Sequence, residues 1–271
     1  MARSALLNVM VDAVLKAGRS LTRDFNEVEN LQVSVKGPGD FVSQADIKAE
    51  KTLRGALDKA RPGYSYLMEE GGVIDRGSDH RWIIDPLDGT TNFLHSHPFF
   101  AVSVALESHG QLEAGVIYNP ITEELFTAEK GRGAFMNDRR MRVAGRNAFD
   151  ECVIATGIPA LNRGAHGVAL YRQRDIMSRV AGIRATGSAA LNLAYLAAGR
   201  FDGYWEDGLH PWDIAAGLLM VREAGGFATE PDEDASMYET GRIVSGNEFV
   251  HGRLRELLNK PLPEAMTKAR G

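Results

Sequence analysis

The stretch from Trp82 to Phe93 constrains the fold of this chain more than any other. It opens with Trp82-Ile83-Ile84, an apolar and β-branched run that predicts a buried strand delivering Asp85 at its end. Pro86 has no N–H to donate, so the strand ladder is expected to stop there. The chain is therefore expected to contain a β-sheet with an acidic turn at the end of one buried strand.

The acidic turn carries a second carboxylate. Asp88 follows Asp85 by three residues, and Leu87 between them can offer only its backbone carbonyl to the same point. Gly89-Thr90-Thr91 comes next and suits a helix start, where free N–H groups attract an anion. Carboxylates on one side and N–H groups on the other favour a site for a divalent cation and a phosphate. Two simpler structures fit part of the pattern: a strand-exit turn of Asp, Pro and Gly, or Asp88 acting only as a helix cap.

Length and composition place the chain among ordinary globular proteins. Its 271 residues allow one large domain or two halves, and 44% of them are hydrophobic and 25% charged. Apolar stretches such as residues 102–106 are too short to span a bilayer, and Asp12 and Lys16 interrupt the N-terminal apolar pattern, which disfavours a signal peptide. Cys152 is the single cysteine, so no internal disulfide can form. These features predict a cytoplasmic protein that does not enter a membrane.

The charge distribution bears on the class of partner. A net charge of −5 disfavours general nucleic-acid binding. One local exception is a basic stretch, which is expected to form the solvated face of a hairpin. Its members are Lys130, Arg132, Arg139, Arg140, Arg142 and Arg146.

Hydrophobic periodicity predicts helices packed on a mostly antiparallel sheet in the first half, residues 1–146, and an alternating α/β arrangement with helices on both faces of a sheet in residues 147–271. Together they are expected to form one domain, 1–271. In the first half the pattern predicts a helix over 5–23, a helix from the Ser43-Gln44-Ala45-Asp46 capping box to residue 60, and strands over 31–35, 64–68, 82–85, 99–107, 112–118, 125–128, 131–136 and 140–143. In the second half it predicts strands over 152–156, 182–185, 201–206 and 242–245, and helices over 165–180, 188–198, 211–224 and 247–259.

Three motifs resemble those of the inositol monophosphatase family. Asp85-Pro86-Leu87-Asp88-Gly89-Thr90-Thr91-Asn92-Phe93 is similar to the family's first signature, His210-Pro211-Trp212-Asp213-Ile214-Ala215-Ala216-Gly217 to its second, and Met68-Glu69-Glu70-Gly71-Gly72 to the acidic pair before the first. The resemblance runs in the right order from about Lys36 to Gly246. It implies a layered α-β-α-β-α sandwich of the α/β type, a metal-dependent phosphatase activity and commonly a homodimer.

The resemblance also implies a metal site whose ligands are all oxygens. Hard oxygen ligands favour Mg²⁺, with Mn²⁺ as a substitute. The resemblance implies two or three such ions, and inhibition by Li⁺ and by Ca²⁺. The family uses the first glutamate of the acidic pair, and Asp213 also fits a simpler role in complementing the dipole of the helix that it begins. The implied ligands are Glu69, Asp85, the Leu87 carbonyl, Asp88 and Asp213.

The catalytic residues that the resemblance implies are Glu69, Thr90 and Asp46. Glu69 helps to hold the metal that activates the attacking water, Thr90 orients that water, and Asp46 polarises the Thr90 hydroxyl. Asp46 also stands where a capping box needs a carboxylate, and the two roles can coexist. Lys36 matches a family lysine near the metal waters, although a lysine before Gly-Pro-Gly is commonly just exposed.

Substrate contacts follow from the same resemblance. Glu206 matches an acid that accepts hydrogen bonds from inositol hydroxyls, and the loop after the Cys152 strand lacks the serine that the family often has there, which leaves the polyol open. His95 and His97 are expected at the surface rather than in a zinc site. The residues expected to contact substrate are Asp88, Gly89, Thr90, Gly187, Ser188, Ala189, Glu206 and Asp213.

The expected reaction is hydrolysis of inositol 1-phosphate to myo-inositol and phosphate by a metal-activated water. Relatives use the same chemistry on histidinol phosphate, fructose 1,6-bisphosphate or phosphoadenosine nucleotides, but Asn92, Phe93 and Glu206 favour inositol. A function of another class remains open. The sequence is similar to bacterial extragenic-suppressor phosphatases, some of which are partners of the transcription antitermination machinery, and the basic stretch is the feature that fits this role.

Overall fold

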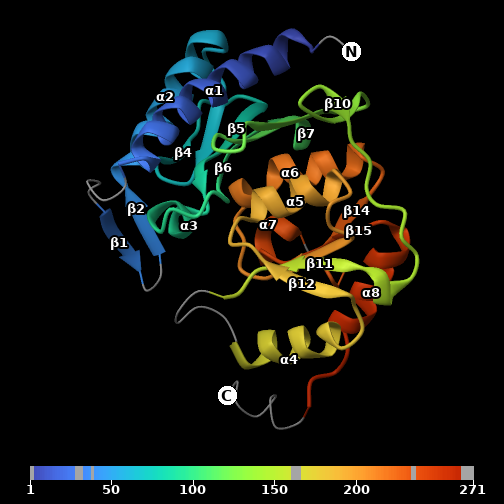
Figure 1. Cartoon of the computed structure of the whole chain (residues 1–271). Coiled ribbons are helices and arrows are strands. Elements are labelled where there is room, and N and C mark those ends of the chain that lie inside the picture. Colours follow the sequence, from blue (N-terminus) through green and yellow to red (C-terminus); the bar gives the residue numbers. More distant parts are fainter. Residues whose placement is uncertain (1–2, 28–32, 38–39, 160–165, 233–235, 264–271) are drawn as a thin grey trace.

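The computed structural model describes residues 3–27, 33–37, 40–159, 166–232 and 236–263, and side chains outside residues 28–42 within those ranges. Figure 1 shows five layers: α1 and α2, a large sheet, α5 and α6, a smaller sheet, and α4 with α8. This confirms the predicted α-β-α-β-α sandwich.

The large sheet has eight strands in the order β10-β9-β8-β7-β6-β5-β3-β4, and only β3 and β5 pair in parallel. It is therefore mostly antiparallel, as predicted. Its strands are β3 (Ser65–Met68), β4 (Gly72–Ile74), β5 (His80–Asp88), β6 (Ala101–Ser108), β7 (Gln111–Asn119), β8 (Glu124–Glu129), β9 (Gly133–Met136) and β10 (Arg139–Arg140). The helices of this half are α1 (Ala5–Phe25), α2 (Gln44–Ala60) and the short α3 (Thr90–Leu94), and β1 (Val33–Gly37) pairs with β2 (Asp40–Ser43) alone.

The smaller sheet has five strands in the order β12-β11-β13-β15-β14, of which β11 pairs in parallel with β12 and β13. Its strands are β11 (Val153–Thr156), β12 (Gly182–Ala185), β13 (Gly203–Glu206), β14 (Phe227–Thr229) and β15 (Ile243–Gly246). The helices of this half are α4 (His166–Met177), α5 (Ala189–Ala197), α6 (Pro211–Glu223), α7 (Met237–Thr240) and α8 (Glu248–Leu258), preceded by the 3₁₀ helix η2 (Phe149–Glu151).

Strand β6 shows how one sequence serves two cores. Alternate side chains point to opposite faces of a strand. Val102 and Val104 pack toward α1 and α2, whereas Ala101 and Ala105 pack toward α5 and α6. Small residues on that second face let α6 come close, and at Gly115 of β7 an added Cβ would lie only 3.0 Å from the backbone of Ala216. This close approach brings the beginning of α6 to the acidic end of β5.

Several element boundaries differ from the prediction. The expected strand over 140–143 is limited to β10, the helix expected over 165–180 is described from His166 to Met177, and residues 31–32 lie outside the described ranges. The short elements β2, β4, β14 and α7 were not predicted, because three or four residues carry no recognisable period. The Asn137-Asp138 turn is confirmed, with φ of 45° and 62° at its two residues.

Candidate active site

The prediction that Pro86 ends the strand was wrong. β5 continues to Asp88 through a bulge, since Asp85 pairs with Ser103 and Asp88 pairs with Ala101 while the residues between them fall out of register. A bulge lets a proline leave the hydrogen-bonded ladder without ending the strand. Within it the Leu87 N–H donates to Asp85 Oδ1 at 2.9 Å, and the Leu87 side chain is buried in the core toward α2. The Leu87 carbonyl accepts a hydrogen bond from the Thr90 hydroxyl at 3.1 Å, which ties the bulge to the start of α3.

Asp88 is fixed by the start of α5 in the other half of the chain. Its Oδ2 accepts a short hydrogen bond from the Ser188 hydroxyl and another from the Ala190 N–H at 2.8 Å. Ser188 also caps α5, because its Oγ accepts from the Leu191 N–H at 3.2 Å. The Gly187-Ser188-Ala189 loop, expected to contact substrate, thus contacts Asp88.

Asp213 reaches the same point from α6. It lies in the first turn of that helix and accepts a hydrogen bond from the His210 N–H at 2.7 Å. One ligand atom from each of Asp85, Asp88 and Asp213 can be chosen so that all three lie within 4.8 Å of one another. Asp213 therefore lies in the first turn of α6, where the helix-dipole role considered for it applies, and it also caps that helix and belongs to the acidic cluster.

The electrostatics of this cluster are unfavourable without a cation. Burial, followed by the charges of Glu69, Asp88 and Asp213, raises the pKa of Asp85 well above its ordinary value. Burial and then Asp88 do the same to the pKa of Asp213, and burial raises the pKa of Asp88 to about 6 against its hydrogen bonds. Carboxylates crowded in this way repel one another when ionised. The oxygen-only donor set and this repulsion fit a hard divalent cation.

Glu69 joins the cluster from the turn after β3. Its N–H donates to the Ile84 carbonyl at 3.2 Å, and its carboxyl is hydrogen-bonded to Asp85. The next residue, Glu70, is held through its N–H by Glu50 Oε2 at 2.9 Å. Sequence reasoning missed Glu50. The available signal was its spacing, since it follows Asp46 by four residues on the buried face of α2.

Asp46 and Thr90 are in contact. The Thr90 hydroxyl lies 3.1 Å from both Asp46 Oδ1 and the Leu87 carbonyl oxygen. The other oxygen, Oδ2, accepts from the Ser43 N–H at 2.9 Å and the Ser43 hydroxyl at 2.5 Å, which completes the predicted capping box. Burial raises the pKa of Asp46, while these hydrogen bonds oppose the rise.

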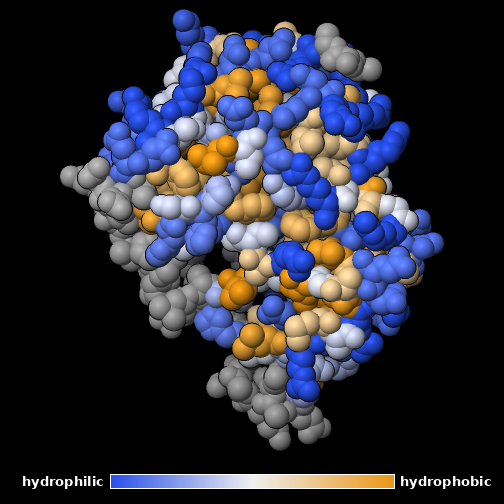
Figure 2. Space-filling view, viewed as in Figure 1, coloured by the Kyte–Doolittle hydropathy of each residue, from blue (hydrophilic) through white to orange (hydrophobic). Residues whose placement is uncertain are grey.

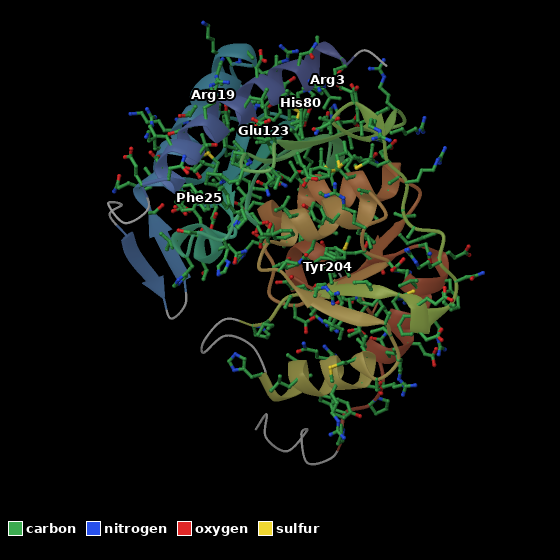
Figure 3. The ribbon with its side chains drawn as sticks, in the orientation of Figure 1. Arg3, Arg19, Phe25, His80, Glu123 and Tyr204 are labelled. Carbon is green, nitrogen blue, oxygen red and sulfur yellow. The ribbon has the colours of Figure 1, made fainter. Side chains whose placement is uncertain are left out.

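Glu206 ends β13 in the smaller sheet. It accepts a hydrogen bond from the Tyr204 hydroxyl at 2.6 Å, and Figure 3 places Tyr204 between that sheet and the α5–α6 layer. Burial raises the pKa of Glu206 to about 7, with smaller contributions from Asp88 and Asp207. An added Cβ at Gly157 would lie 1.9 Å from the Glu206 carboxyl, so a larger residue there would displace that side chain.

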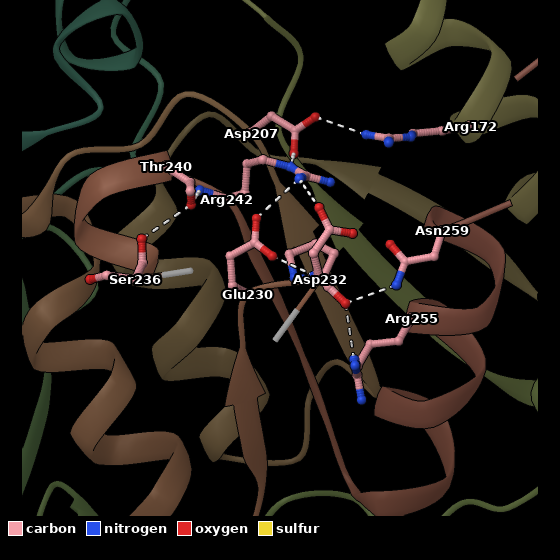
Figure 4. Close-up of polar contacts among 10 residues, drawn as sticks. Arg172, Asp207, Glu230, Asp232, Ser236, Thr240, Arg242, Arg255 and Asn259 are labelled. Carbon is pink, nitrogen blue, oxygen red and sulfur yellow. Dashed lines mark hydrogen bonds and ion pairs between the residues drawn. The ribbon is translucent and has the colours of Figure 1, made fainter. Parts of the chain in front are cut away.

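Asp207, directly after Glu206, begins a network of charges (Figure 4). It lies 3.1 Å from Arg172 of α4 and 3.4 Å from Arg242, and Arg242 also pairs with Glu230 and Asp232. The network ties Asp207, which follows β13, to α4 and to the segments beside β14 and β15.

Asn92 joins two parts of the site, and sequence reasoning did not predict this contact. Its amide donates to the carbonyls of Phe99 at 2.7 Å and Thr186 at 2.8 Å, and so joins α3 to the loop that holds Asp88. Gly89 has φ of 93° and an added Cβ there would lie 3.2 Å from the Gly187 carbonyl oxygen. The turn at Gly89 and the Gly187-Ser188-Ala189 loop are therefore packed directly against each other.

The remaining predicted residues lie outside the cluster. His95 and His97 are exposed, as expected, and the side chain of Lys36 lies outside the described residues. In the basic stretch, Lys130, Arg132 and Arg146 pair with Glu113, Glu129 and Asp202. Arg139, Arg140 and Arg142 are exposed.

The structure is a layered α/β sandwich in which the large sheet and the α5–α6 layer bring carboxylates from both halves of the chain to one acidic, oxygen-only cluster. A sequence model of the inositol monophosphatase family matches residues 2–267. The chain belongs to this family and is a phosphatase.

Individual relatives cover nearly the whole chain. An inositol-1-monophosphatase of Mesorhizobium japonicum is 62% identical over 97% of this chain and 99% of that protein. A Nus factor SuhB of Pseudomonas aeruginosa is 40% identical over 97% and 99% of the two chains. The crystal structure of an extragenic suppressor protein SuhB from Bartonella henselae superposes with a TM-score of 0.93 at 58% identity, covering 96% of this chain and 100% of that one.

No helix in the described part of the chain combines the length and apolarity needed to cross a membrane. The face in Figure 2 is largely hydrophilic, with apolar side chains in separate small groups.

Proposed function

We propose that the chain is a Mg²⁺-dependent phosphatase of small polyol and sugar phosphate monoesters, with inositol 1-phosphate as its preferred substrate. The observation that carries this proposal is the convergence of Asp85, Asp88 and Asp213 within 4.8 Å, with the pKa of each carboxyl raised. Two or three ions would be held by Glu69, Asp85, the Leu87 carbonyl, Asp88 and Asp213. Mn²⁺ is expected to substitute, and Li⁺ and Ca²⁺ to inhibit.

When bound, divalent ions neutralise the phosphate oxygens, lower the pKa of a water and stabilise the leaving alkoxide. Thr90 supplies the positioning of the attacking water. Its hydroxyl proton is directed to Asp46 Oδ1 or to the Leu87 carbonyl, each 3.1 Å away, which leaves an oxygen lone pair to accept a hydrogen bond from the water. Asp46 in this role is a positioning residue that acts through Thr90.

We assign to Glu206 the hydrogen bond with a hydroxyl of the polyol. This carboxyl keeps one hydrogen bond from Tyr204 and can accept another from a substrate hydroxyl. Its pKa of about 7 means that it is partly protonated near neutral pH, so acceptance by the ionised form is expected to improve as the pH rises above 7. The name of the Mesorhizobium japonicum relative, an inositol-1-monophosphatase at 62% identity, supports inositol 1-phosphate as the substrate.

A substrate panel tests the proposal. Phosphate release would be measured with Mg²⁺ and with a chelator for inositol 1-phosphate, histidinol phosphate, fructose 1,6-bisphosphate and a phosphoadenosine nucleotide. The expected result is Mg²⁺-dependent turnover with the highest kcat/KM for inositol 1-phosphate. A higher kcat/KM for another ester would correct the substrate, and turnover of none of them would overturn the proposal.

A second candidate function is a partner role in transcription antitermination, favoured by the 40% identity to a Nus factor SuhB. The exposed Arg139, Arg140 and Arg142 are the surface proposed for it. Reversing these three charges should weaken a complex recovered with transcription factors and leave turnover unchanged. Undiminished recovery would remove the basic stretch from the proposal. The chain is also proposed to form a homodimer, which sedimentation of the purified protein would test.

A further inference from the structure

Helix α3 is too short to be stable by itself. It has five residues, Thr90–Leu94, and its N-cap, Gly89, makes no side-chain hydrogen bond to the first N–H groups. A helix of this length is not stable alone in water, so neighbouring parts of the molecule must hold it in place. Because Thr90 begins this helix and its hydroxyl contacts Asp46, the residues that hold α3 also position that contact.

Two adjacent side chains hold α3 on different sides. Phe93 is fully buried in the first half of the chain, where its ring centroid lies 5.0 Å from that of Phe100. Asn92 faces the second half. Its amide group carries two hydrogens, and both are donated to backbone carbonyls, one to Phe99 at 2.7 Å and one to Thr186 at 2.8 Å. Asn92 therefore connects α3 with the segment just before α5.

This contact lies next to the loop that holds Asp88. An added Cβ at Gly187 would lie only 3.0 Å from the Asn92 amide nitrogen, so the loop and this side chain are closely packed. The next residue, Ser188, donates a hydrogen bond to Asp88, and so does the Ala190 N–H. The position of Asp88 therefore depends on how firmly a loop of the second half is fixed to the first half.

We propose that Asn92 is a positioning residue that fixes this loop against α3 and thereby holds Asp88 in place, a role that rests on the metal-dependent function proposed for the chain. Ser188 and Asn92 then act together, since Ser188 attaches the loop to Asp88 and Asn92 attaches it to α3. Loss of either residue loosens the same loop. A purely structural role of Asn92 would lower stability and leave the affinity for Mg²⁺ unchanged.

The chain offers a matched control for Asn92→Ala. The Asn247 amide also donates to two backbone carbonyls, at 2.8 Å each, and its Oδ1 caps α8. It follows Gly246, which pairs with Gly203 at the opposite end of β13 from Glu206. Asn247→Ala therefore removes as many amide hydrogen bonds, and a helix cap as well, away from the Asn92 contact.

Hydrogen exchange and Mg²⁺ calorimetry would be measured on the full chain. In Asn92→Ala, amide exchange over residues 186–191 in chelator is expected to become about fivefold faster or more, the scale of one lost hydrogen bond. The Mg²⁺ Kd is expected to rise about tenfold or more, as for other residues that support a metal ligand. Asn247→Ala should lower the melting temperature and change neither quantity. Asn92→Ala with Ser188→Ala should weaken Mg²⁺ binding by less than the product of the two single losses, because both residues hold one loop.

Melting temperatures would show that each variant is folded, and Asn92→Ser replaces Asn92→Ala if the alanine variant unfolds. Unchanged exchange over residues 186–191 in the folded Asn92 variant would overturn the proposal, and so would an equal increase in Asn247→Ala. An unchanged Mg²⁺ Kd in the Asn92 variant would also overturn it. If the wild type binds no Mg²⁺, the phosphatase proposal fails, and the exchange measurement still decides whether Asn92 fixes the loop.

Discussion

At the scale of single residues, Asp46 serves two neighbours with different oxygens. Oδ2 completes the capping box with Ser43, and Oδ1 faces Thr90. Thr90→Val therefore leaves the cap intact and removes only the proposed catalytic contact. We expect it to lower kcat by roughly 10²-fold or more while the melting temperature changes little.

The double variant of this pair provides the sharper comparison. Asp46→Asn keeps the shape of the side chain but no longer offers two carboxylate oxygens, and we expect a similar loss in kcat. Because residues that act as a unit are not additive, Asp46→Asn with Thr90→Val should be scarcely slower than either alone. Losses that multiply in kcat would show that the two residues act independently.

Ser188 gives a second prediction at this scale. Its hydroxyl is hydrogen-bonded to Asp88, and removing such a support from a metal ligand typically costs about 10–100-fold in metal affinity. Ser188→Ala should weaken Mg²⁺ binding in calorimetry by that amount, and Ser188→Thr should restore most of it. Ser4→Ala is the control, because it also removes a serine that caps a helix, here α1, and Ser4 is remote in sequence from the acidic motifs. It should leave the Mg²⁺ Kd unchanged. A normal Kd in Ser188→Ala would mean that the backbone N–H of Ala190 alone positions Asp88.

At the scale of elements, one buried face of α2 carries two residues that position the site, Asp46 and Glu50. Glu50 holds the N–H of Glu70 and thereby the turn that carries Glu69. Glu50→Ala leaves that N–H without its acceptor, which should lower the free energy of unfolding by about 1–3 kcal/mol in urea titrations and weaken Mg²⁺ binding. Lys51→Ala, an exposed neighbour on the same helix, should change neither. An unaltered Mg²⁺ Kd in Glu50→Ala would separate this turn from the metal site.

The elements also show what sequence could predict. Long periodic segments such as α1, α5 and α6 were predicted to within a few residues, because burial of one face repeats at a helical period. The bulge in β5 was not, since the rule that proline ends a ladder ignores a strand that resumes two residues later. The five-layer order came from the resemblance, and the structure confirms it.

The sequence motifs predicted the carboxylates of the candidate site, but they did not predict the residues that hold those carboxylates in position. Asp85 and Asp88 share one local pattern, but nothing local places Ser188 on Asp88 or Asn92 on the Thr186 carbonyl. Such contacts depend on how α5 and α6 pack between the two sheets. For Glu50 only part of the role is predictable. Its helical spacing from Asp46 places it on the same face of α2, but nothing in the sequence identifies the Glu70 N–H as its partner.

At the scale of the whole molecule, the carboxylates link stability to pH. Their raised pKa values mean that the folded state binds more protons than the unfolded chain, in which carboxyls titrate near pH 4. The metal-free protein should therefore lose stability as the pH rises from about 4 through the pKa of Asp88, about 6, and that of Glu206, about 7. Mg²⁺ binds the ionised form, so its stabilising effect should grow over the same interval.

Melting temperatures between pH 5 and 8, with Mg²⁺ and with chelator, would check this linkage. Asp88→Asn removes one of the titrating carboxyls, so its metal-free stability should fall less steeply with pH than that of the wild type. A metal-free melting temperature with the same pH dependence in both proteins would contradict the role of Asp88 in the linkage.

The central claim is that Asp85, Asp88 and Asp213 hold the divalent metal on which phosphoester hydrolysis depends. The most direct measurement is calorimetric titration of Mg²⁺ into wild type and Asp213→Asn, with phosphate release from inositol 1-phosphate followed in the same samples. The amide oxygen of asparagine can still accept the His210 N–H, so the start of α6 should remain folded. The account predicts that Asp213→Asn loses about 100-fold or more in both Mg²⁺ affinity and turnover at a near-native melting temperature. Wild-type affinity and turnover in the folded variant, or full wild-type turnover in chelator, would contradict it.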